Sequence, residues 1–288
     1  MKKVLLDTDI GTDIDDALCL AYLLARQDCE LMGITTVSGE AEKRAMMASA
    51  ICKQANKDIP IFPGAKEPLI ITQHQPHAQQ ACKLSNWEHD TSFESGYAVE
   101  FMRKTIRENP GEVSLLAVGP LTNIAALFKA DEEIPSLLKE LVLMCGYFPR
   151  PELTRPEWNA ACDPHAAAIV YGAKVNRHIS VGLDVTEKLV LHKDKLNRHK
   201  ENHLLKPVLD FAEVWFENAE TTTFHDPLAA AVIFDDGICE FENGNISIDL
   251  SSERLKGAAY FDRAVGGAHS VAMNVDVDRF FEHYFAAF

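Results

Sequence analysis

Residues 3–16 read Lys-Val-Leu-Leu-Asp-Thr-Asp-Ile-Gly-Thr-Asp-Ile-Asp-Asp, and this stretch decides the fold. Its first five residues contain a short apolar run of three residues, and an apolar stretch of helical length follows at 17–26. A strand that leads through a turn into a helix is the first half of a β–α–β unit. The alternation recurs, with further strands expected at 31–37, 59–62, 113–118, 141–144 and 179–183 and helices at 42–55 and 121–129.

Two Asp-Pro pairs mark further helix starts. Asp163-Pro164 and Asp226-Pro227 each combine an acidic N-cap with proline in the first turn. Near the carboxyl end, Glu242-Asn243-Gly244-Asn245 predicts the turn of an antiparallel hairpin. We therefore expect an α/β fold, in which residues 1–288 form a single domain with a mostly parallel central sheet flanked by helices, plus a small late antiparallel hairpin.

The composition excludes several classes of function. Lys and Arg number 28 against 43 Asp and Glu, and a net charge of −15 disfavours binding to nucleic acid or to an anionic membrane surface. No apolar run approaches a membrane span, and the one at the N-terminus is too short for a signal peptide. The seven cysteines lack any Cys-x-x-Cys pair, which is typical of reduced thiols in a cytoplasmic protein.

The end of the first strand is unusually acidic. Ligands of such sheets bind beyond the carboxyl ends of the strands. Five like charges repel one another, so a bound cation is a natural way to hold them, and oxygen ligands select Ca²⁺ or Mg²⁺. The alternative is that one Asp caps the next helix and the others lie in a solvated loop. The five carboxylates are Asp7, Asp9, Asp13, Asp15 and Asp16.

Two other kinds of acidic site have a spacing of Asp residues that can be matched to this segment. An EF-hand loop beginning at Asp7 requires Gly at its sixth position and Glu at its twelfth, where the chain has Thr12 and Leu18. A haloacid-dehalogenase-like phosphatase also begins with a strand that ends in Asp-x-Asp. It would use Asp7 as nucleophile and Asp9 as acid and base, although Gly11 departs from its usual Thr or Val. The phosphatase remains an alternative.

The other strand ends extend the pattern over nearly the whole chain. In order, the motifs are Ile34-Thr-Thr-Val-Ser-Gly39, Ala117-Val-Gly-Pro-Leu-Thr-Asn-Ile-Ala125, Glu157-Trp-Asn159, Asp163-Pro-His-Ala-Ala167, Leu183-Asp-Val-Thr186 and His225-Asp226. This set resembles the inosine–uridine-preferring nucleoside hydrolase family. The resemblance implies a calcium-dependent enzyme of nucleoside salvage, which hydrolyses the N-glycosidic bond of ribonucleosides to free base and ribose.

The resemblance also implies a set of metal ligands. By matching position, the carboxylates of Asp9, Asp16 and Asp226 would bind Ca²⁺, together with the backbone carbonyl of Thr122. One departure concerns Asp13, because Thr12-Asp13-Ile14 separates Gly11 from the Asp pair and Asp13 could compete for the ion.

Substrate contacts follow from the same matching. Asp15 would lie over the ribose hydroxyls, Glu157 and Asn159 would hold the sugar from the opposite side, and Met144 would line its underside. A second departure is Glu40, which stands where the family normally has Asn. A carboxylate there adds negative charge near the metal and removes an amide donor, which would either tighten cation binding or indicate a substrate other than a plain ribonucleoside. Glu40 is therefore also a candidate substrate contact.

The chemistry of the reaction agrees with these assignments. Cleavage of a ribosyl C–N bond passes through an oxocarbenium-like cation, which a ring of carboxylates favours. A metal-bound water would be the nucleophile, with Asp9 as its base. His225 would supply a proton to the leaving base, although it could instead be an ordinary histidine at a helix start. We expect structural roles for Asp184 and Thr186, and a helix cap at Asn123.

Base recognition is not determined by these motifs, and purine, pyrimidine or both remain open. Lids formed by 72–95 or 217–223 would exclude water from the site. The family forms dimers and tetramers, so we expect a homodimer or homotetramer. A non-catalytic, ribosyl-binding relative is the remaining alternative. Candidate base contacts are His74, His77, Trp87, His89, Phe148, Trp158, Phe216 and Phe224.

Overall fold

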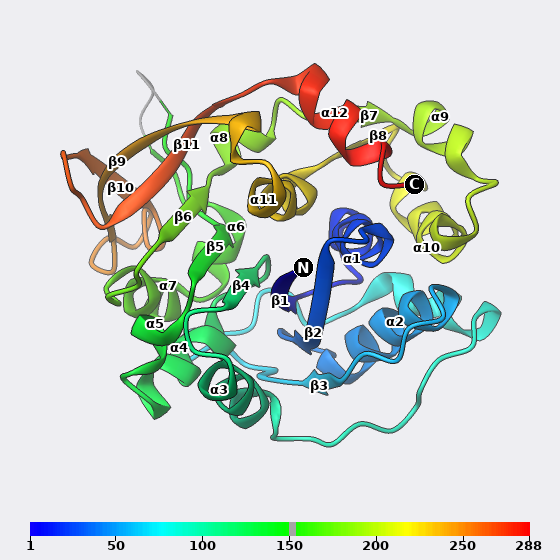
Figure 1. Cartoon of the computed structure of the whole chain (residues 1–288), viewed down its shortest axis with the longest axis horizontal. Coiled ribbons are helices and arrows are strands. Elements are labelled where there is room, and N and C mark those ends of the chain that lie inside the picture. The colour runs from blue at the N-terminus through cyan, green and yellow to red at the C-terminus, as the bar shows by residue number, and fades with distance from the viewer. Residues whose placement is uncertain (150–153) are drawn as a thin grey trace.

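A nine-stranded sheet forms the centre of the molecule in the computed structural model, which describes residues 1–149 and 154–288 (Figure 1). The strand order is β10-β9-β11-β6-β5-β4-β1-β2-β3, and neighbours from β11 through β3 are parallel, whereas β9 pairs antiparallel with both β10 and β11. The strands are β1 (Lys2–Thr8), β2 (Cys29–Thr36), β3 (Ile61–Pro63), β4 (Val113–Ala117), β5 (Glu140–Met144), β6 (His178–Val181), β9 (Cys239–Ile248), β10 (Ala259–Arg263) and β11 (His269–Val275).

Helices cover both faces of the sheet, which explains why the central strands are apolar without alternation. Every residue of β4 and β5 is buried. One face packs against α1 (Asp15–Ala25), α2 (Ala41–Gln54), α10 (Lys206–Phe216), α11 (His225–Phe234) and α12 (Val277–Phe285). The other packs against α3 (Ala98–Glu108), α4 (Thr122–Ala130), α5 (Ile134–Leu137) and α7 (Pro164–Tyr171).

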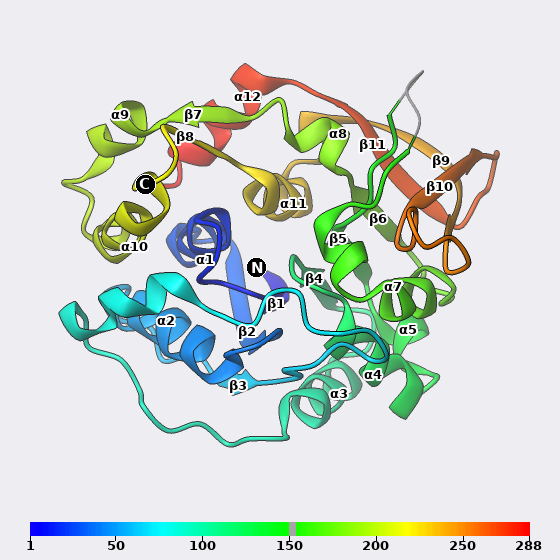
Figure 2. The same cartoon turned by 180° about the vertical axis from the view of Figure 1, so that it is seen from behind.

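Shorter elements connect this framework. They are η1 (Gln79–Asn86), α6 (Trp158–Cys162), α8 (Leu183–Thr186), α9 (Lys193–Leu196) and the two-stranded sheet of β7 (Val190–His192) and β8 (Thr221–Thr223). The connection between β3 and α3, drawn in cyan, passes beside α2 and the start of α1 (Figure 2). Its Gln80 N–H donates to the Gly11 carbonyl, 3.1 Å away. None of the described helices is long and apolar enough to cross a bilayer.

The strand order places a crevice between β1 and β4. The chain adds β2 and β3 on one side of β1, and then returns to add β4, β5 and β6 on the other. Ligands of such sheets bind at this reversal, outside the carboxyl ends of the strands. The acidic segment after β1 therefore faces the turn after β4.

Two local predictions were wrong. Asn243-Gly244 lies inside the continuous strand β9, and the chain turns between β9 and β10 instead. Gly244 is required there because a Cβ would lie 2.3 Å from the Phe261 ring, so this glycine marks close packing and not a turn. Asp226 is not an N-cap, because α11 already begins at His225. By contrast, Asp163 caps α7 as predicted, accepting from Ala166 N–H at 3.0 Å.

Candidate active site

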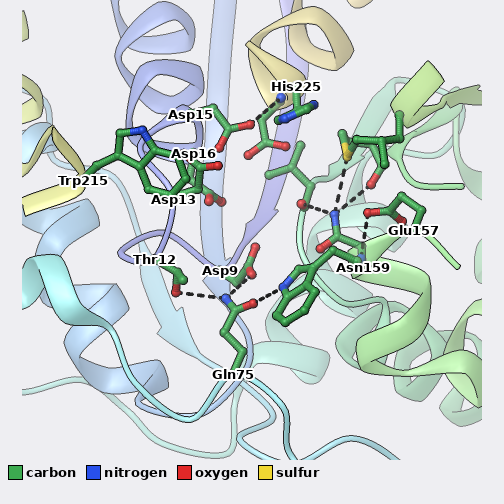
Figure 3. A pocket seen from close by; sticks show the side chains of 15 residues that line it. Asp9, Thr12, Asp13, Asp15, Asp16, Gln75, Glu157, Asn159, Trp215 and His225 are labelled. Carbon is green, nitrogen blue, oxygen red and sulfur yellow. Dashed lines mark hydrogen bonds between the residues drawn. The ribbon is translucent and has the colours of Figure 1, made fainter. Parts of the chain in front are cut away.

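A cavity of about 310 Å³ lies at the carboxyl ends of β1 and β4 (Figure 3). It brings together side chains from parts of the chain that are far apart in the sequence, namely the segment after β1, α1, the connection after β3, β5, α6, α10 and α11. Six carboxylates line it, and no Lys or Arg is among its described lining residues. The lining is Asp9, Thr12, Asp13, Asp15, Asp16, Gln75, Val118, Met144, Glu157, Trp158, Asn159, Leu183, Trp215, His225 and Asp226.

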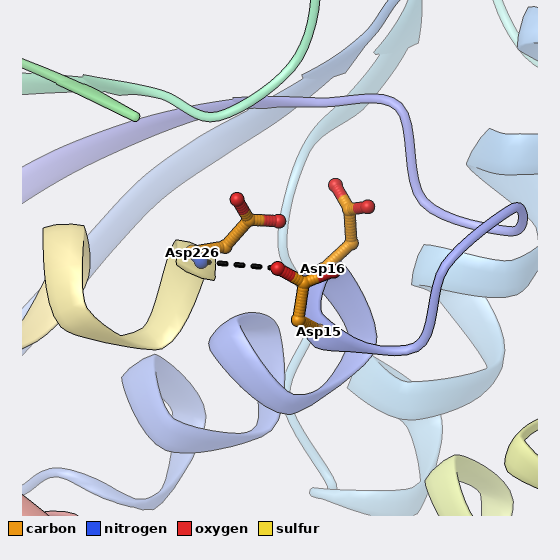
Figure 4. Close-up of side chains that lie close together, drawn as sticks. All are labelled: Asp15, Asp16 and Asp226. Carbon is orange, nitrogen blue, oxygen red and sulfur yellow. Dashed lines mark hydrogen bonds between the residues drawn. The ribbon is translucent and has the colours of Figure 1, made fainter. Parts of the chain in front are cut away.

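Three buried carboxylates form the most compact acidic cluster. One oxygen from each of Asp15, Asp16 and Asp226 lies within 4.8 Å of the others (Figure 4). Asp15 accepts the Asp226 N–H at 3.1 Å, and Asp16 accepts the Thr8 hydroxyl. Burial raises the pKa of Asp15 to about 7, and burial with mutual repulsion raises the pKa of Asp16 and Asp226 well above the usual range. Such an oxygen-only set fits a hard divalent cation, whose charge would hold the three carboxylates ionised.

Asp9 lies beside this cluster at the end of β1. Burial raises its pKa, and the nearby Arg44 guanidinium opposes that effect. Arg44 is fully buried and donates to the backbone carbonyls of Asp9 and Ile10. The turn after β4 comes so close that a Cβ at Gly119 would lie 2.7 Å from Asp9 Oδ1. Arg44 thus fixes the backbone of Asp9, and the glycine turn leaves room for its carboxylate.

The sugar-binding candidates line the wall formed by α6 and β5. Glu157 caps α6 and accepts three backbone N–H groups, from Gly146, Asn159 and Ala160. Burial raises its pKa, and these three bonds lower it. Asn159 Nδ2 donates to the carbonyls of Val118 at 2.7 Å and Met144 at 2.9 Å, which leaves its Oδ1 as the polar atom available to a ligand.

His225 and Asp13 lie in the same cavity. Burial lowers the pKa of His225, and the negative charge of Asp13 partly offsets this. Burial raises the pKa of Asp13 to about 8. His225 Nδ1 lies 2.7 Å from the hydroxyl of Thr186, whose oxygen is also 3.3 Å from the Leu183 carbonyl. Thr186, expected to be structural, therefore contacts the candidate acid directly.

Thr122 and Glu40, a predicted metal ligand and a predicted substrate contact, are not among the residues that line this cavity. Thr122 is in the first turn of α4, and its hydroxyl donates to Asp163 Oδ2 at 2.8 Å. The residue of this turn that lines the cavity is Val118. Glu40 accepts from Lys43 and from the Ala78 N–H, so its carboxylate anchors the loop after β3 and does not face the cavity.

Asp7 is also outside the cavity, which contradicts the phosphatase alternative. It is fully buried in the sheet, where its Oδ2 accepts from Thr35 Oγ1 at 2.5 Å and Asn123 Nδ2 at 2.7 Å. Burial raises its pKa to about 7. Asn123 is likewise not a helix cap: it joins Asp7 to the Thr36 carbonyl and accepts the Ala65 N–H.

Of the aromatic candidates for base contact, only Trp158 lines the cavity. Phe148 and Phe224 are buried among other aromatic rings, and Trp87 donates to Asp210 on the outer side of α10. Trp215, one residue before the candidate Phe216, contributes the second indole. Of the two predicted lids, 72–95 supplies Gln75, and 217–223 supplies only the Thr221 carbonyl that accepts from Trp215.

Sequence reasoning missed five lining residues. Thr12 and Val118 belong to motifs that were recognised, so their place beside Asp9 and Asn159 was a usable signal. Leu183 likewise begins a recognised motif, whereas Gln75 and Trp215 belong to none of the motifs and enter the cavity through long-range folding.

Comparison with known proteins agrees with this geometry. Residues 4–282 match the family model described as inosine-uridine preferring nucleoside hydrolase. The probable uridine nucleosidase 2 of Oryza sativa subsp. japonica is 28% identical over 86% of this chain and 78% of its own. The pyrimidine-specific ribonucleoside hydrolase RihA of Salmonella paratyphi B is 27% identical over 96% of this chain and 94% of its own.

Solved structures show the same fold. The purine-preferring ribonucleoside hydrolase from Gardnerella vaginalis superposes with a TM-score of 0.83 at 23% identity, over 99% of this chain and 98% of that one. A plant nucleoside hydrolase, PpNRh1, superposes with a TM-score of 0.80 at 21% identity over the same shares. The chain belongs to the family of inosine-uridine preferring nucleoside hydrolases.

Proposed function

We propose that this nucleoside N-ribosyl hydrolase is calcium-dependent and releases free base and ribose from ribonucleosides in nucleoside salvage. The observation that carries the proposal is the cavity itself, which places six carboxylates around one space of nucleoside-binding size. A neutral ribonucleoside gains positive charge on its sugar as the C–N bond breaks. Surrounding carboxylates stabilise that transition state more than the ground state.

Asp16 and Asp226 of the compact cluster would hold the metal together with Asp9, whose charge acts on both. Asp15, the third member of the cluster, would then be left for the sugar. The Val118 carbonyl, which also accepts from Asn159 Nδ2, replaces Thr122 as the proposed backbone ligand. Ca²⁺ accepts six to eight oxygen ligands, so such a site keeps places for sugar hydroxyls and a water, which Mg²⁺ would hold less readily. When bound, the ion supplies the positive charge that orients the sugar and makes that water easier to deprotonate.

The side chains around the ion divide the remaining work. Asp15, fixed by the Asp226 N–H, accepts hydrogen bonds from the ribose hydroxyls. Glu157 and the Oδ1 of Asn159 hold the sugar from the opposite wall, above Met144. These contacts keep the anomeric carbon in line with the attacking water.

Two residues move protons. Asp9 takes the proton of the attacking water, an effect typically worth about 10²- to 10⁴-fold. His225 donates from Nε2 to the leaving base. In its cationic form the ring donates from Nδ1 to Thr186, whose own hydrogen then goes to the Leu183 carbonyl. Thr186 thus supports the acid form of the histidine.

The charge of the cavity favours nucleosides over nucleotides. A 5′-phosphate would enter a space lined by six carboxylates and by no described Lys or Arg, so the carboxylates that do not bind the ion would repel it. Uridine is a candidate substrate because curated relatives are named uridine nucleosidases. We further propose that the protein is cytoplasmic, which the seven free cysteines support, and that it forms a homodimer or homotetramer.

The test is release of reducing sugar from inosine, adenosine, guanosine, uridine and cytidine. Each reaction is run as purified, with EDTA, and with EDTA followed by excess Ca²⁺ or Mg²⁺. Release that EDTA stops and Ca²⁺ restores better than Mg²⁺ is the expected result, and the panel gives the base preference. Binding of nucleosides without any sugar release would instead identify a non-catalytic relative.

A further inference from the structure

The side chain of Gln75 bridges two walls of the cavity (Figure 3). Its Nε2 donates to Asp9 Oδ2 at 2.6 Å and contacts Thr12 Oγ1 at 3.0 Å. Its Oε1 accepts from the indole Nε1 of Trp158. Gln75 is buried, whereas Trp158 is 55% exposed at the rim of the cavity. One amide therefore connects Asp9, the candidate general base of the reaction, to the indole of Trp158 beside the sugar-binding wall.

The chemistry of its partners prevents this amide from reversing. An ionised carboxylate only accepts hydrogen bonds and an indole N–H only donates. Rotation of the Gln75 amide by 180° would place oxygen against Asp9 and nitrogen against the Trp158 N–H, and both bonds would be lost. The bridge therefore has one orientation, which restrains rotation of the Asp9 carboxylate and of the Trp158 ring together.

The backbone of Gln75 is hydrogen-bonded as well as its side chain. Its N–H donates to Gln73 Oε1 at 2.7 Å. Its carbonyl accepts from Ser38 Oγ and from Arg44 Nη2, each at 3.4 Å. Arg44 is the same buried cation that donates to the Asp9 carbonyl, so one side chain contacts the backbone of both residues of the Asp9–Gln75 pair.

The turn after β2 is shaped to admit this backbone. Ser38 and Gly39 have φ values of 76° and 55°, in the left-handed region. A Cβ on Gly39 would lie 2.5 Å from the Gln75 carbonyl oxygen and 2.3 Å from that of Pro76. A non-glycine residue in this conformation stores strain, which occurs preferentially at functional sites. The local structure thus accepts strain where Gln75 is brought to the cavity.

We propose that Gln75 is a positioning residue of the hydrolysis, one that aims the Asp9 carboxylate and couples its orientation to Trp158. The inference rests on the proposed function. The hydrogen bond from Gln75 Nε2 to Asp9 Oδ2 determines which lone pairs of the Asp9 carboxylate face the attacking water. Because the same amide is fixed by Trp158, a change at the indole N–H is transmitted to the proton-transfer step.

A double-mutant cycle tests this coupling. Gln75→Leu removes both amide groups, and Trp158→Phe keeps an aromatic ring while removing the N–H. Loss of a hydrogen bond to a charged group predicts that Gln75→Leu lowers kcat about 10- to 100-fold, with KM changed less than threefold. Trp158→Phe lowers kcat about fivefold in the wild-type background and has no further effect on kcat in Gln75→Leu.

Two more variants separate positioning from folding. Gln75→Glu keeps an acceptor for Trp158 but loses the donor to Asp9, so its kcat falls as far as that of Gln75→Leu. Gln79→Leu changes an exposed residue of the same connection and leaves kcat unchanged. Melting temperature is measured for each variant with Ca²⁺ present.

The outcomes are distinct. Wild-type kcat in Gln75→Leu, or additive effects of Gln75→Leu and Trp158→Phe, overturns the inference while leaving the proposed function intact. A fall in kcat matched by an equal fall in the folded fraction also overturns it, because Gln75 would then be merely structural. An inactive wild-type enzyme overturns the proposed function and this inference with it.

Discussion

Replacement of Thr186 by valine tests how the leaving base is protonated. Thr186 is fully buried, and valine has nearly its shape, so the change removes a hydroxyl and little else. That hydroxyl is 2.7 Å from His225 Nδ1 and accepts from it when the ring is cationic. Without it, a buried N–H⁺ loses its partner, and the protonated ring becomes less favourable. We therefore expect Thr186→Val to slow only reactions that need the acid.

The structure sets the size of the effect. A hydrogen bond to a charged group is worth about 1.5–3 kcal/mol. At about 1.4 kcal/mol for each factor of ten, kcat for inosine falls about 10- to 150-fold. His225→Ala removes the acid itself and costs about 10²- to 10⁴-fold, so the effect of Thr186→Val must be the smaller of the two.

The assay compares inosine with p-nitrophenyl riboside, whose leaving group departs as a stable anion without a proton. Thr186→Val and His225→Ala should lower kcat for inosine and leave the nitrophenyl substrate within about threefold. Thr186→Ser, which restores the hydroxyl, should recover most of the activity toward inosine. Equal losses on both substrates, in properly folded variants, would show that the histidine is not the acid and that Thr186 supports the site only sterically.

Three other perturbations have defined outcomes. Saturating Ca²⁺ at about 100 times Kd should stabilise the wild type by about 2.7 kcal/mol, seen as a higher melting temperature; Asp226→Asn should abolish the increase, and an unchanged increase would place the ion elsewhere. Gly39→Ala and Gly96→Ala both add a Cβ at positive φ, but only the Cβ at Gly39 would clash with backbone, because Gly96 faces open space. Gly39→Ala should therefore lower kcat and the free energy of unfolding more than Gly96→Ala. Equal effects of the two substitutions would contradict the packing argument. Burial, and secondarily the neighbouring His269, lowers the pKa of His178 well below 6.5. The unfolded chain therefore binds an extra proton, and the folded state loses stability as pH falls through 6.5. His178→Phe should flatten the decline in unfolding free energy between about pH 7.5 and pH 5, measured by denaturant titration, and an identical decline would refute this.

The architecture and most of the residues that line the cavity were predictable from local patterns. Apolar runs of strand length alternating with helices determine a parallel sheet with two covered faces, since no other arrangement buries them. Acidic and polar motifs at strand ends converge at one edge because parallel strands share a direction. For that reason Asp9, Asp15, Asp16, Glu157, Asn159, His225 and Asp226 could all be expected in one place, and all line the cavity.

Predictions from local sequence were wrong or incomplete where one residue type suits more than one structural role. Asn243-Gly244 is a strong turn signal, but its glycine is required inside β9 by the Phe261 ring. Asn123 follows a typical helix start, yet its amide joins strand ends through Asp7. Glu40 matched a motif position that points toward a substrate, and its carboxylate instead holds the loop after β3. Each side chain has several partners of similar chemistry, and only the tertiary structure selects among them.

The contacts that position the candidate catalytic residues depend on long-range packing. Gln75 reaches Asp9 across 66 residues of sequence, and Thr186 reaches His225 across 39. Trp215 enters the cavity because α10 packs against the same face as α1. Hydrophobic periodicity is read within one element, whereas a hydrogen bond between elements depends on angles and distances set by the whole core. The carboxylates proposed to bind the ion could therefore be named from the sequence, whereas the backbone ligand and the residues that orient these carboxylates depend on the tertiary structure.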